Sequence, residues 1–351
     1  MLKIRVLVVD DSVVVRSRIS KLLSSDPELE VVGVAATGSI ALSKIPQLNP
    51  DVVILDIEMP DMDGLETLAA IRKSYPVLPV IMFSTFTRAG ASATLEALSL
   101  GATDYATKPS NLGSVEAANK HIWEDLVPKI KLFGSGTTKL VPPVTPELIA
   151  TPTRSLTQRV DVIAIGVSTG GPNALATMLP HLPADFPVPV LIVQHMPPMF
   201  TKLLAERLAS ISQIQVDEAI PGTVLKPGQA WIAPGDFHMI VERSGEDVQI
   251  VTHQAPPENS CRPSVDVLFR SVAEVYQSGA IAVVLTGMGQ DGLHGCECIR
   301  SVGGQILAQD KASSVVWGMP GFVANAGLAD QVLPLNQMAD TIIGRIKHNR
   351  A

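Results

Sequence analysis

The chain has 351 residues, of which 46% are hydrophobic, 17% are charged and 4% are aromatic. This composition excludes an intrinsically disordered protein, and the length predicts two domains, each large enough to bury its own core. The net charge of −7 is spread along the chain, since residues 1–135 carry 13 basic and 16 acidic side chains and residues 136–351 carry 14 and 18. Neither part has the basic face that a nucleic-acid-binding module needs.

Signals for secretion, membrane insertion and disulfide bonding are weak throughout the chain. No apolar run approaches the roughly 18 residues of a membrane span, and the apolar N-terminal stretch reaches Asp10 and Asp11 too soon for a secretory signal. The three cysteines, at positions 261, 296 and 298, do not make a disulfide framework in a chain of this length. We therefore expect a cytoplasmic protein without direct membrane insertion.

Short apolar runs alternate with helical patterns over residues 1–133, which we predict to be one domain. The runs are rich in Val, Ile and Leu, which is typical of strands buried on both faces of a parallel sheet. The expected strands are 4–9, 31–35, 52–55, 79–83 and 104–106, and the expected helices are 13–24, 38–47, 64–74, 88–100 and 112–132. Such a doubly wound α/β sheet has its functional crevice at the carboxyl ends of the strands.

Acidic side chains follow two of these strands. Asp10 and Asp11 end the first strand and Asp56 ends the third. Three carboxylates at one edge would repel one another without a hard cation, so we predict Mg²⁺ held by Asp10, Asp11 and Asp56 with water completing its shell. A carboxylate beside Mg²⁺ can attack a phosphoryl group while a hydroxyl and a lysine, here Ser84 and Lys108, hold the transferred oxygens. A single Asp after a strand is more often a helix N-cap, so the prediction depends on the whole set.

This set resembles the receiver domain of bacterial response regulators over residues 3–123. The residues in register are Asp10-Asp11, Asp56 followed by Met59-Pro60, Asp63-Gly64, Ser84 and Lys108-Pro109. The resemblance implies that a histidine kinase supplies a phosphoryl group to Asp56. It also implies that Ser84, where threonine is commoner, and Tyr105 are the switch hydroxyl and switch aromatic residue. Lys108 would then contact the phosphoryl group through a cis Lys108–Pro109 bond.

Residues 134–157 hold four prolines, many Ser and Thr residues and one acid, Glu147. No helical or strand period there is long enough to bury a face, so we predict a flexible linker. The remaining residues, 158–351, form the second predicted domain.

The second domain begins with the apolar strand 162–167, followed by Ser168-Thr169-Gly170-Gly171-Pro172 and a helical stretch at about 173–179. The segment 166–170 matches G-x-S-x-G, a strand-to-helix turn that exposes a serine hydroxyl beside helix N–H groups. A dinucleotide-binding turn is the alternative. It is disfavoured because a glycine is wanted where Ser168 stands and an acid is wanted where Gln194 and His195 stand.

A serine nucleophile needs a base and an orienting acid at neighbouring strand ends. His195 is the histidine that ends a strand, 190–194, and Asp291 follows the buried strand 280–286. We therefore predict a Ser168, His195, Asp291 triad, with the backbone N–H groups near Thr169 and Met288 as candidates for the oxyanion hole. The order Ser, His, Asp differs from that of α/β-hydrolases.

Residues 158–347 resemble the catalytic domain of the bacterial chemotaxis protein-glutamate methylesterases, which are response regulators. The matching segments are Gly166 to Pro172, Gln194 to Pro197, Ile232 to Gly235, Arg262 to Phe269 and Leu285 to Gly292. The resemblance implies two doubly wound, mainly parallel α/β domains, a flavodoxin-like receiver and a Rossmann-like three-layer hydrolase domain. The implied activity is hydrolysis of glutamate methyl esters, with deamidation of certain glutamines, on the cytoplasmic helices of chemoreceptors.

In this family the unmodified receiver packs over the catalytic crevice and phosphorylation weakens that packing, so we expect phosphorylation of Asp56 to activate the hydrolase. We expect a monomer and no cofactor at the hydrolase site. Two alternatives remain open: a phosphorylation-controlled interaction protein with an unused triad, and a hydrolase of another ester or amide. The sequence does not identify the receptors or the kinase.

The run His294-Gly295-Cys296-Glu297-Cys298 suggests a metal cluster. Cysteines two residues apart on a helix point about 200° away from each other, so they cannot readily share one ion. We therefore predict free thiols at Cys296 and Cys298 and an inert thiol at Cys261.

Overall fold

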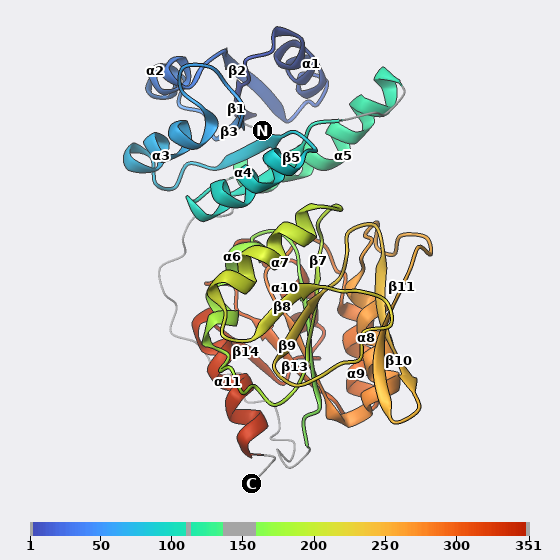
Figure 1. Ribbon diagram of the computed structural model, residues 1–351. Coiled ribbons are helices and arrows are strands. Elements are labelled where there is room, and N and C mark those ends of the chain that lie inside the picture. Colours follow the sequence, from blue (N-terminus) through green and yellow to red (C-terminus); the bar gives the residue numbers. More distant parts are fainter. Residues whose placement is uncertain (1–2, 110–113, 136–158, 349–351) are drawn as a thin grey trace. The chain divides into compact units, whose positions relative to one another are not determined.

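The computed structural model describes residues 3–109, 114–135 and 159–348, which fall into two compact units, Met1–Leu140 and Val141–Ala351 (Figure 1). The predicted linker 134–157 lies outside the described residues except at its start. There Gly134 is the last residue of a helix, so the helix reaches one residue into the predicted linker.

The first unit contains a five-stranded sheet in the order β2-β1-β3-β4-β5, in which neighbouring strands are parallel. The doubly wound α/β fold predicted from the apolar runs is therefore confirmed. The strands are β1 (Ile4–Val9), β2 (Leu29–Ala35), β3 (Val52–Asp56), β4 (Val80–Ser84) and β5 (Asp104–Thr107). The helices are α1 (Val13–Leu23), α2 (Gly38–Leu48), α3 (Gly64–Ser74), α4 (Arg88–Ser99) and α5 (Val115–Gly134).

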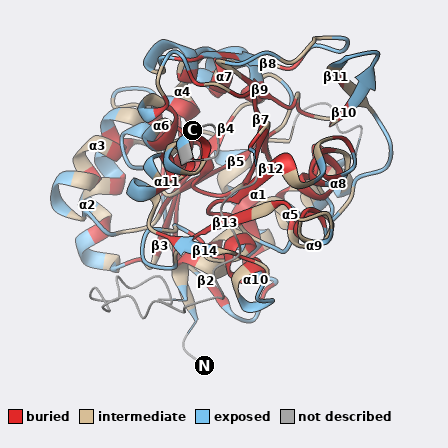
Figure 2. Cartoon of the chain, turned by 90° about the horizontal axis from the view of Figure 1, so that it is seen from below, coloured by how far each residue is buried: buried red, intermediate tan, exposed pale blue. Residues whose placement is uncertain are grey.

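Two helical layers cover this sheet. Helices α2, α3 and α4 pack in sequence on one another, and α1 packs on α5. Each helix begins at a side chain that accepts a backbone N–H of the first turn, which satisfies one of the donors left open at a helix start. These N-caps are Ser12, Thr37, Asp63, Thr87 and Ser114. Strands β1, β3, β4 and β5 are buried along most of their length, whereas the edge strand β2 is buried only at its two ends (Figure 2).

The second unit contains a seven-stranded parallel sheet in the order β14-β13-β12-β6-β7-β9-β8, together with a two-stranded antiparallel hairpin. The strands of the sheet are β6 (Val162–Val167), β7 (Val190–Gln194), β8 (Gln215–Glu218), β9 (Gln229–Ile232), β12 (Ala280–Val284), β13 (Gln305–Gln309) and β14 (Gln331–Leu333), and those of the hairpin are β10 (His238–Ser244) and β11 (Asp247–His253). The helices are α6 (Gly171–Met178), η1 (Leu179–His181), α7 (Phe200–Ile211), α8 (Val265–Tyr276), η2 (Gln277–Gly279), α9 (Leu293–Ser301), α10 (Met319–Asn325) and α11 (Leu335–His348).

This unit has the three layers expected of a Rossmann-like domain. Helix α6 packs on α7 and α11, while α9 packs on α8 and α10. The chain builds the sheet outward in both directions from β6, through β7 on one side and through β12 on the other. Ligands of open α/β sheets bind where the strand order reverses, so the carboxyl ends of β12, β6 and β7 are the expected site.

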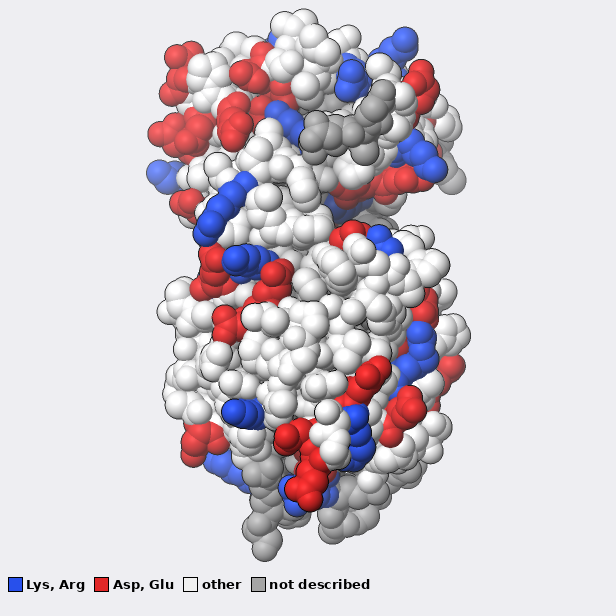
Figure 3. All heavy atoms as spheres, turned by 45° about the vertical axis from the view of Figure 1, so that its right-hand side comes forward, with Lys and Arg blue, Asp and Glu red and all other residues white. Residues whose placement is uncertain are grey.

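No helix in the described part of the chain is long and apolar enough to cross a bilayer. The face drawn in Figure 3 carries acidic and basic side chains interspersed, without a continuous basic stripe.

Candidate active site

The strand order brings Ser168 and His195 to neighbouring positions at the edge of the sheet. Val167 and Gln194 are partners in the β6–β7 register, so the next residue of each strand is a candidate catalytic side chain. The His195 N–H donates to the Val167 carbonyl at 3.1 Å, and the Ser168 N–H donates to the Thr286 carbonyl at 3.0 Å. The backbone after β6 is thus held from both neighbouring strands.

A tight turn carries Ser168 from β6 into α6. Gly170 has a φ of +78°, a conformation that L side chains rarely adopt. A Cβ on Gly171 would lie 1.9 Å from Oε1 of the buried Gln194, whose Nε2 donates to the Ser168 carbonyl at 2.9 Å. Small residues are therefore required for close packing beneath the serine.

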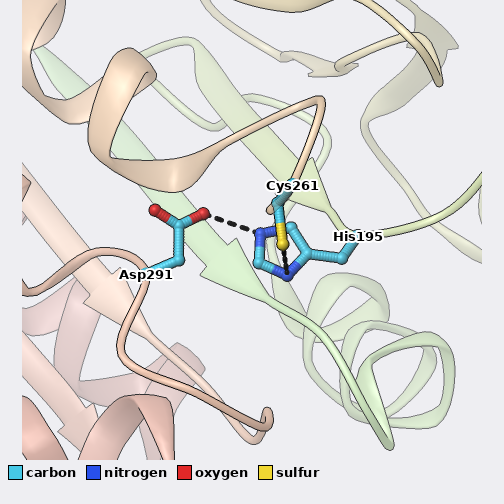
Figure 4. A group of neighbouring side chains, drawn as sticks. All are labelled: His195, Cys261 and Asp291. Atoms are coloured by element: carbon cyan, nitrogen blue, oxygen red, sulfur yellow. Dashed lines mark hydrogen bonds and ion pairs between the residues drawn. The ribbon is translucent and has the colours of Figure 1, made fainter. Parts of the chain in front are cut away.

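Asp291 is buried and contacts His195 directly, with Oδ2 at 2.8 Å from Nε2 (Figure 4). The first turn of α8 holds the same carboxylate, because Oδ2 accepts the Val265 N–H at 2.7 Å and Oδ1 accepts the Asp266 N–H at 3.1 Å. Burial raises the pKa of Asp291, but the hydrogen bonds and charge of His195 and these two backbone donors outweigh burial and lower it well below its usual value. Asp291 is therefore an ionised carboxylate fixed on the imidazole.

Two further side chains, which the sequence analysis did not identify, also donate hydrogen bonds to the Asp291 carboxylate. The buried Ser264 hydroxyl donates to Asp291 Oδ1 at 2.8 Å, and Asn259 Nδ2 donates to the same oxygen at 3.0 Å. Ser264 lies within the matched segment Arg262 to Phe269, so that segment was a signal for a role near the site. Asn259 lies in a loop with no such signal.

The other ring nitrogen of His195 meets a cysteine. Nδ1 lies 3.5 Å from Sγ of Cys261 (Figure 4). Cys261 is a free thiol, and its predicted inertness stays a prediction; the sequence analysis did not anticipate that it lies beside His195. Within the described part of the chain, the Ser168 hydroxyl makes no hydrogen bond to this nitrogen.

The charge state of His195 depends on both neighbours. Burial lowers the pKa of His195, whereas its hydrogen bonds and electrostatic interactions with Asp291 and Cys261 raise it, and the net effect is a raised pKa. The predicted oxyanion-hole donors, the N–H groups of Thr169 and Met288, stay a prediction. Thr169 is buried, and its carbonyl accepts the Thr286 hydroxyl at 2.9 Å.

In the first unit, the predicted magnesium ligands Asp10, Asp11 and Asp56 do come together, with one carboxylate oxygen of each within 4.8 Å of the others. Lys108 Nζ lies 2.7 Å from Asp56 Oδ2 and 2.9 Å from Asp10 Oδ2. Oδ1 of the buried Asp56 has no hydrogen-bond partner among the described residues. A cluster of carboxylates with an unsatisfied buried oxygen fits a hard cation such as Mg²⁺.

Burial raises the pKa of Asp56 to about 6, with a further contribution from the charge of Asp10, although Lys108 opposes the shift. A tight packing contact also fixes this residue, since a Cβ on Gly64 would lie 2.2 Å from the Asp56 carbonyl oxygen. Close packing against Asp56 therefore explains why glycine stands at position 64 in the Asp63-Gly64 pair.

The expected switch residues lie nearby, with one correction. The buried Ser84 hydroxyl donates to the Gly90 carbonyl at 3.0 Å, and Tyr105 is buried. The Lys108–Pro109 bond, expected to be cis, is not; the cis bond in the described residues is Arg262–Pro263. The Lys108 N–H donates to the Ser84 carbonyl at 2.7 Å, which directs the lysine toward Asp56 without a cis bond.

The run 294–298 is helical, as expected, and lies in α9. Cys296 is fully buried and Cys298 half-buried, and both are free thiols. Among the described residues, groups of three possible metal ligands occur only at the two sites above, around His195 and around Asp56.

Comparisons with known proteins identify the family of each unit. Residues 163–342 match the CheB methylesterase family, and residues 6–119 match the response regulator receiver domain family. A protein-glutamate methylesterase/protein-glutamine glutaminase of Trichodesmium erythraeum is 60% identical over 98% of this chain and 99% of its own length. One from a Nocardioides strain is 49% identical over 99% of this chain and 96% of its length. The crystal structure of the Thermotoga maritima CheB methylesterase catalytic domain is 44% identical, with a TM-score of 0.52, and covers 53% of this chain and 99% of that domain.

Proposed function

Because the chain belongs to the CheB methylesterase family and carries a response regulator receiver domain, we propose that Ser168, His195 and Asp291 are the catalytic triad of a protein-glutamate methylesterase and protein-glutamine glutaminase. The observation that carries this proposal is the 2.8 Å contact of Asp291 with His195 at strand ends that flank Ser168. The substrates are methylated glutamates and certain glutamines of chemoreceptors.

In the proposed reaction, Ser168 Oγ attacks the side-chain carbonyl carbon and its proton passes to His195 Nδ1. Asp291 keeps Nε2 protonated and stabilises the imidazolium. The tetrahedral intermediate collapses as His195 returns the proton to the leaving group, which departs as methanol or ammonia. Water then adds to the acyl-enzyme with the same base, and release of the glutamate carboxylate restores the Ser168 hydroxyl.

The nitrogen that must take the proton is the one that meets Cys261. Since Asp291 occupies Nε2, Nδ1 is the ring nitrogen left for Ser168. A thiol is a weak hydrogen-bond donor, so its 3.5 Å contact is readily exchanged for a hydrogen bond from a hydroxyl. We propose that the Ser168 hydroxyl takes the place of the thiol at Nδ1 when substrate binds.

The receiver domain controls this chemistry through Asp56, which we propose as the site phosphorylated by a histidine kinase. Asp10, Asp11 and Asp56 would hold Mg²⁺, which neutralises charge on the transferred phosphoryl group. Lys108, 2.7 Å from Asp56, is placed to contact a phosphoryl oxygen. Ser84 would turn its hydroxyl from the Gly90 carbonyl toward that group, and the buried Tyr105 would respond as the switch aromatic residue.

Phosphorylation activates the hydrolase by shifting the chain from a closed to an open population, which requires a difference in stability between the two states. The test measures the esterase rate of the full chain and of Asp56→Ala, each with and without a small-molecule phosphodonor. We expect the phosphodonor to raise the rate of the native chain alone. Equal rates in all four conditions would exclude this control.

Methyl-labelled chemoreceptor membranes distinguish the proposed enzyme from the two alternatives. Release of labelled methanol is expected. Binding without release would support an interaction protein with an unused triad, and neither binding nor release would support a hydrolase of another ester or amide. The cytoplasmic location and the monomeric state stay predictions.

A further inference from the structure

His238 is a buried histidine that the proposed reaction does not use. It is the first residue of β10, at the base of the hairpin, and only 1% of it is exposed. Both ring nitrogens meet the chain that runs from the hairpin to α8. Nδ1 accepts the Ser264 N–H at 3.2 Å, and Nε2 lies 3.1 Å from the Pro256 carbonyl oxygen. One imidazole therefore bridges the two ends of residues 256–264, the bridged segment.

The two hydrogen bonds of His238 require one charge state. A backbone N–H only donates and a carbonyl oxygen only accepts, so the ring must carry its proton on Nε2 and a lone pair on Nδ1. A protonated imidazole has a hydrogen on both nitrogens, and the one on Nδ1 would face the Ser264 N–H. That buried donor would then lose its acceptor, which costs the free energy of its desolvation. The bridge therefore exists only while His238 is neutral.

The end of the bridged segment supports the acid of the proposed triad. The Ser264 hydroxyl donates to Asp291 Oδ1 at 2.8 Å, and the N–H of the next residue, Val265, donates to Asp291 Oδ2 at 2.7 Å. Asp291 Oδ2 in turn lies 2.8 Å from Nε2 of His195. A continuous chain of hydrogen bonds thus runs from the His238 ring through the Ser264 backbone and hydroxyl to the imidazole of the triad.

Titratable and charged groups face the His238 ring from the hairpin and from the bridged segment. His253 of β11 is its partner across the hairpin, with ring centroids 5.3 Å apart, and Glu258 and Arg262 belong to the bridged segment. Burial lowers the pKa of His238, and the interactions with His253 and Arg262 lower it further. The hydrogen bond to the backbone carbonyl and the charge of Glu258 raise this pKa, but the net effect is a lowered pKa.

We propose that His238 is a positioning residue of the esterase: the neutral ring holds the bridged segment where it supports Asp291, and protonation of the ring releases that segment. In the released state the ring is in water and has its ordinary pKa of about 6.5. Because the released ring binds a proton more readily than the bridged ring, release grows as the pH falls below about 6.5. The effect on catalysis rests on the proposed esterase function, whereas the release does not.

Two variants separate the hydrogen bonds of the ring. In His238→Asn the side-chain oxygen takes the place of Nδ1, so it accepts the Ser264 N–H but does not titrate. In His238→Gln the amide reaches the place of Nε2, and the Ser264 N–H is left without an acceptor. Both variants lose the ring, so a role that only fills space would be lost in both. His181→Asn is the control, because His181 is exposed and its Nδ1 contacts the nearby Thr177 carbonyl.

The first measurement uses Cys261, which lies in the bridged segment, as a reporter of release and needs no catalysis. The parent is the full chain with Cys298→Ser, in which Cys261 is the half-buried thiol and Cys296 is fully buried. The labelling rate with a dipyridyl disulfide is measured at about pH 8 and about pH 5.5, on either side of the ordinary histidine pKa.

At the higher pH we expect His238→Gln to be labelled about tenfold faster than the parent, as one buried donor is left unpaired, and His238→Asn and His181→Asn to match the parent. At the lower pH the parent should be labelled faster than His238→Asn. Equal rates in His238→Gln and His238→Asn, or a ratio of parent to His238→Asn that does not change with pH, would overturn the proposal. If His238→Gln does not fold, that pH-dependent ratio decides alone.

The second measurement compares kcat for methylated chemoreceptors at about pH 8, where the native ring is neutral. We expect kcat to fall about tenfold in His238→Gln, because Asp291 loses the support of a fixed Ser264, and to be largely restored in His238→Asn. An equal loss in both variants would contradict the positioning role. A native chain without esterase activity would contradict the proposed function, whereas the labelling rates would still test the bridge.

Discussion

Nε2 of His195 lies 2.8 Å from Oδ2 of Asp291, and this contact decides which ring nitrogen does the chemistry. Since Nε2 is held by the carboxylate, Nδ1 is the nitrogen that accepts the proton of Ser168 in the proposed reaction. The same nitrogen lies 3.5 Å from Sγ of Cys261.

The thiol contact predicts a change in the pH dependence of the esterase. Only neutral His195 accepts a proton, so the rate rises as the pH rises through its pKa. Because Cys261 is among the groups that raise the pKa of His195, Cys261→Ala should lower that pKa and move the rising limb of the kcat/KM profile to lower pH. The control Cys298→Ala should leave the limb unchanged. A limb that stays in place or moves to higher pH in Cys261→Ala would contradict this assignment.

The hydrogen bonds that Asp291 accepts at the start of α8 predict a loss of both stability and activity in Ser264→Ala. This buried hydroxyl donates to the ionised Asp291, and its loss leaves the carboxylate with one donor fewer. We expect the free energy of unfolding in urea to fall by about 1–3 kcal/mol and kcat to fall as the imidazole loses its fixed orientation. In Ser210→Ala, where an exposed hydroxyl donates within its own helix, the unfolding free energy should change by less than about 0.5 kcal/mol. Unchanged kcat in Ser264→Ala would show that this support is dispensable.

The acidic cluster predicts that Asp11→Asn weakens magnesium binding. Asp11 is exposed and removing its charge leaves two buried carboxylates, so phosphorylation of Asp56 from a small phosphodonor should need about tenfold more Mg²⁺. Asp61→Asn is a matched control, because Asp61 is also exposed and has a φ of +67°, which asparagine tolerates. The same Mg²⁺ requirement in Asp11→Asn and Asp61→Asn would remove Asp11 from the site.

The sequence was sufficient to predict the strands of the two parallel sheets and the side chains that gather at their carboxyl ends. Runs such as Val6 to Val9 and Val162 to Val167 are apolar without alternation because both faces of the strand are covered, and this pattern placed the strands. Parallel strands end at one edge of a sheet, so the position of His195 directly after β7 and that of Asp291 in the loop after β12 were enough to predict that they meet.

What the sequence could not predict depends on loops and on side-chain directions. Cys261 and Asn259 reach the triad because of a turn with two positive φ angles, and no periodic pattern marks such a turn. The 3.5 Å contact of Cys261 Sγ with His195 depends on that same turn. The Lys108–Pro109 geometry was expected from a resemblance, and here a backbone hydrogen bond from Lys108 to Ser84 positions the lysine instead.

The most direct test of the central claim is methanol release from methylated chemoreceptors by Ser168→Ala, compared with the native chain. Loss of a nucleophile costs orders of magnitude in rate, so the account predicts that less than about a thousandth of the activity remains. Phosphorylation of Asp56 and the unfolding midpoint should stay unchanged, which would show that the fold is intact. Retention of more than about a thousandth of the native rate by a folded Ser168→Ala would contradict a serine nucleophile at this site.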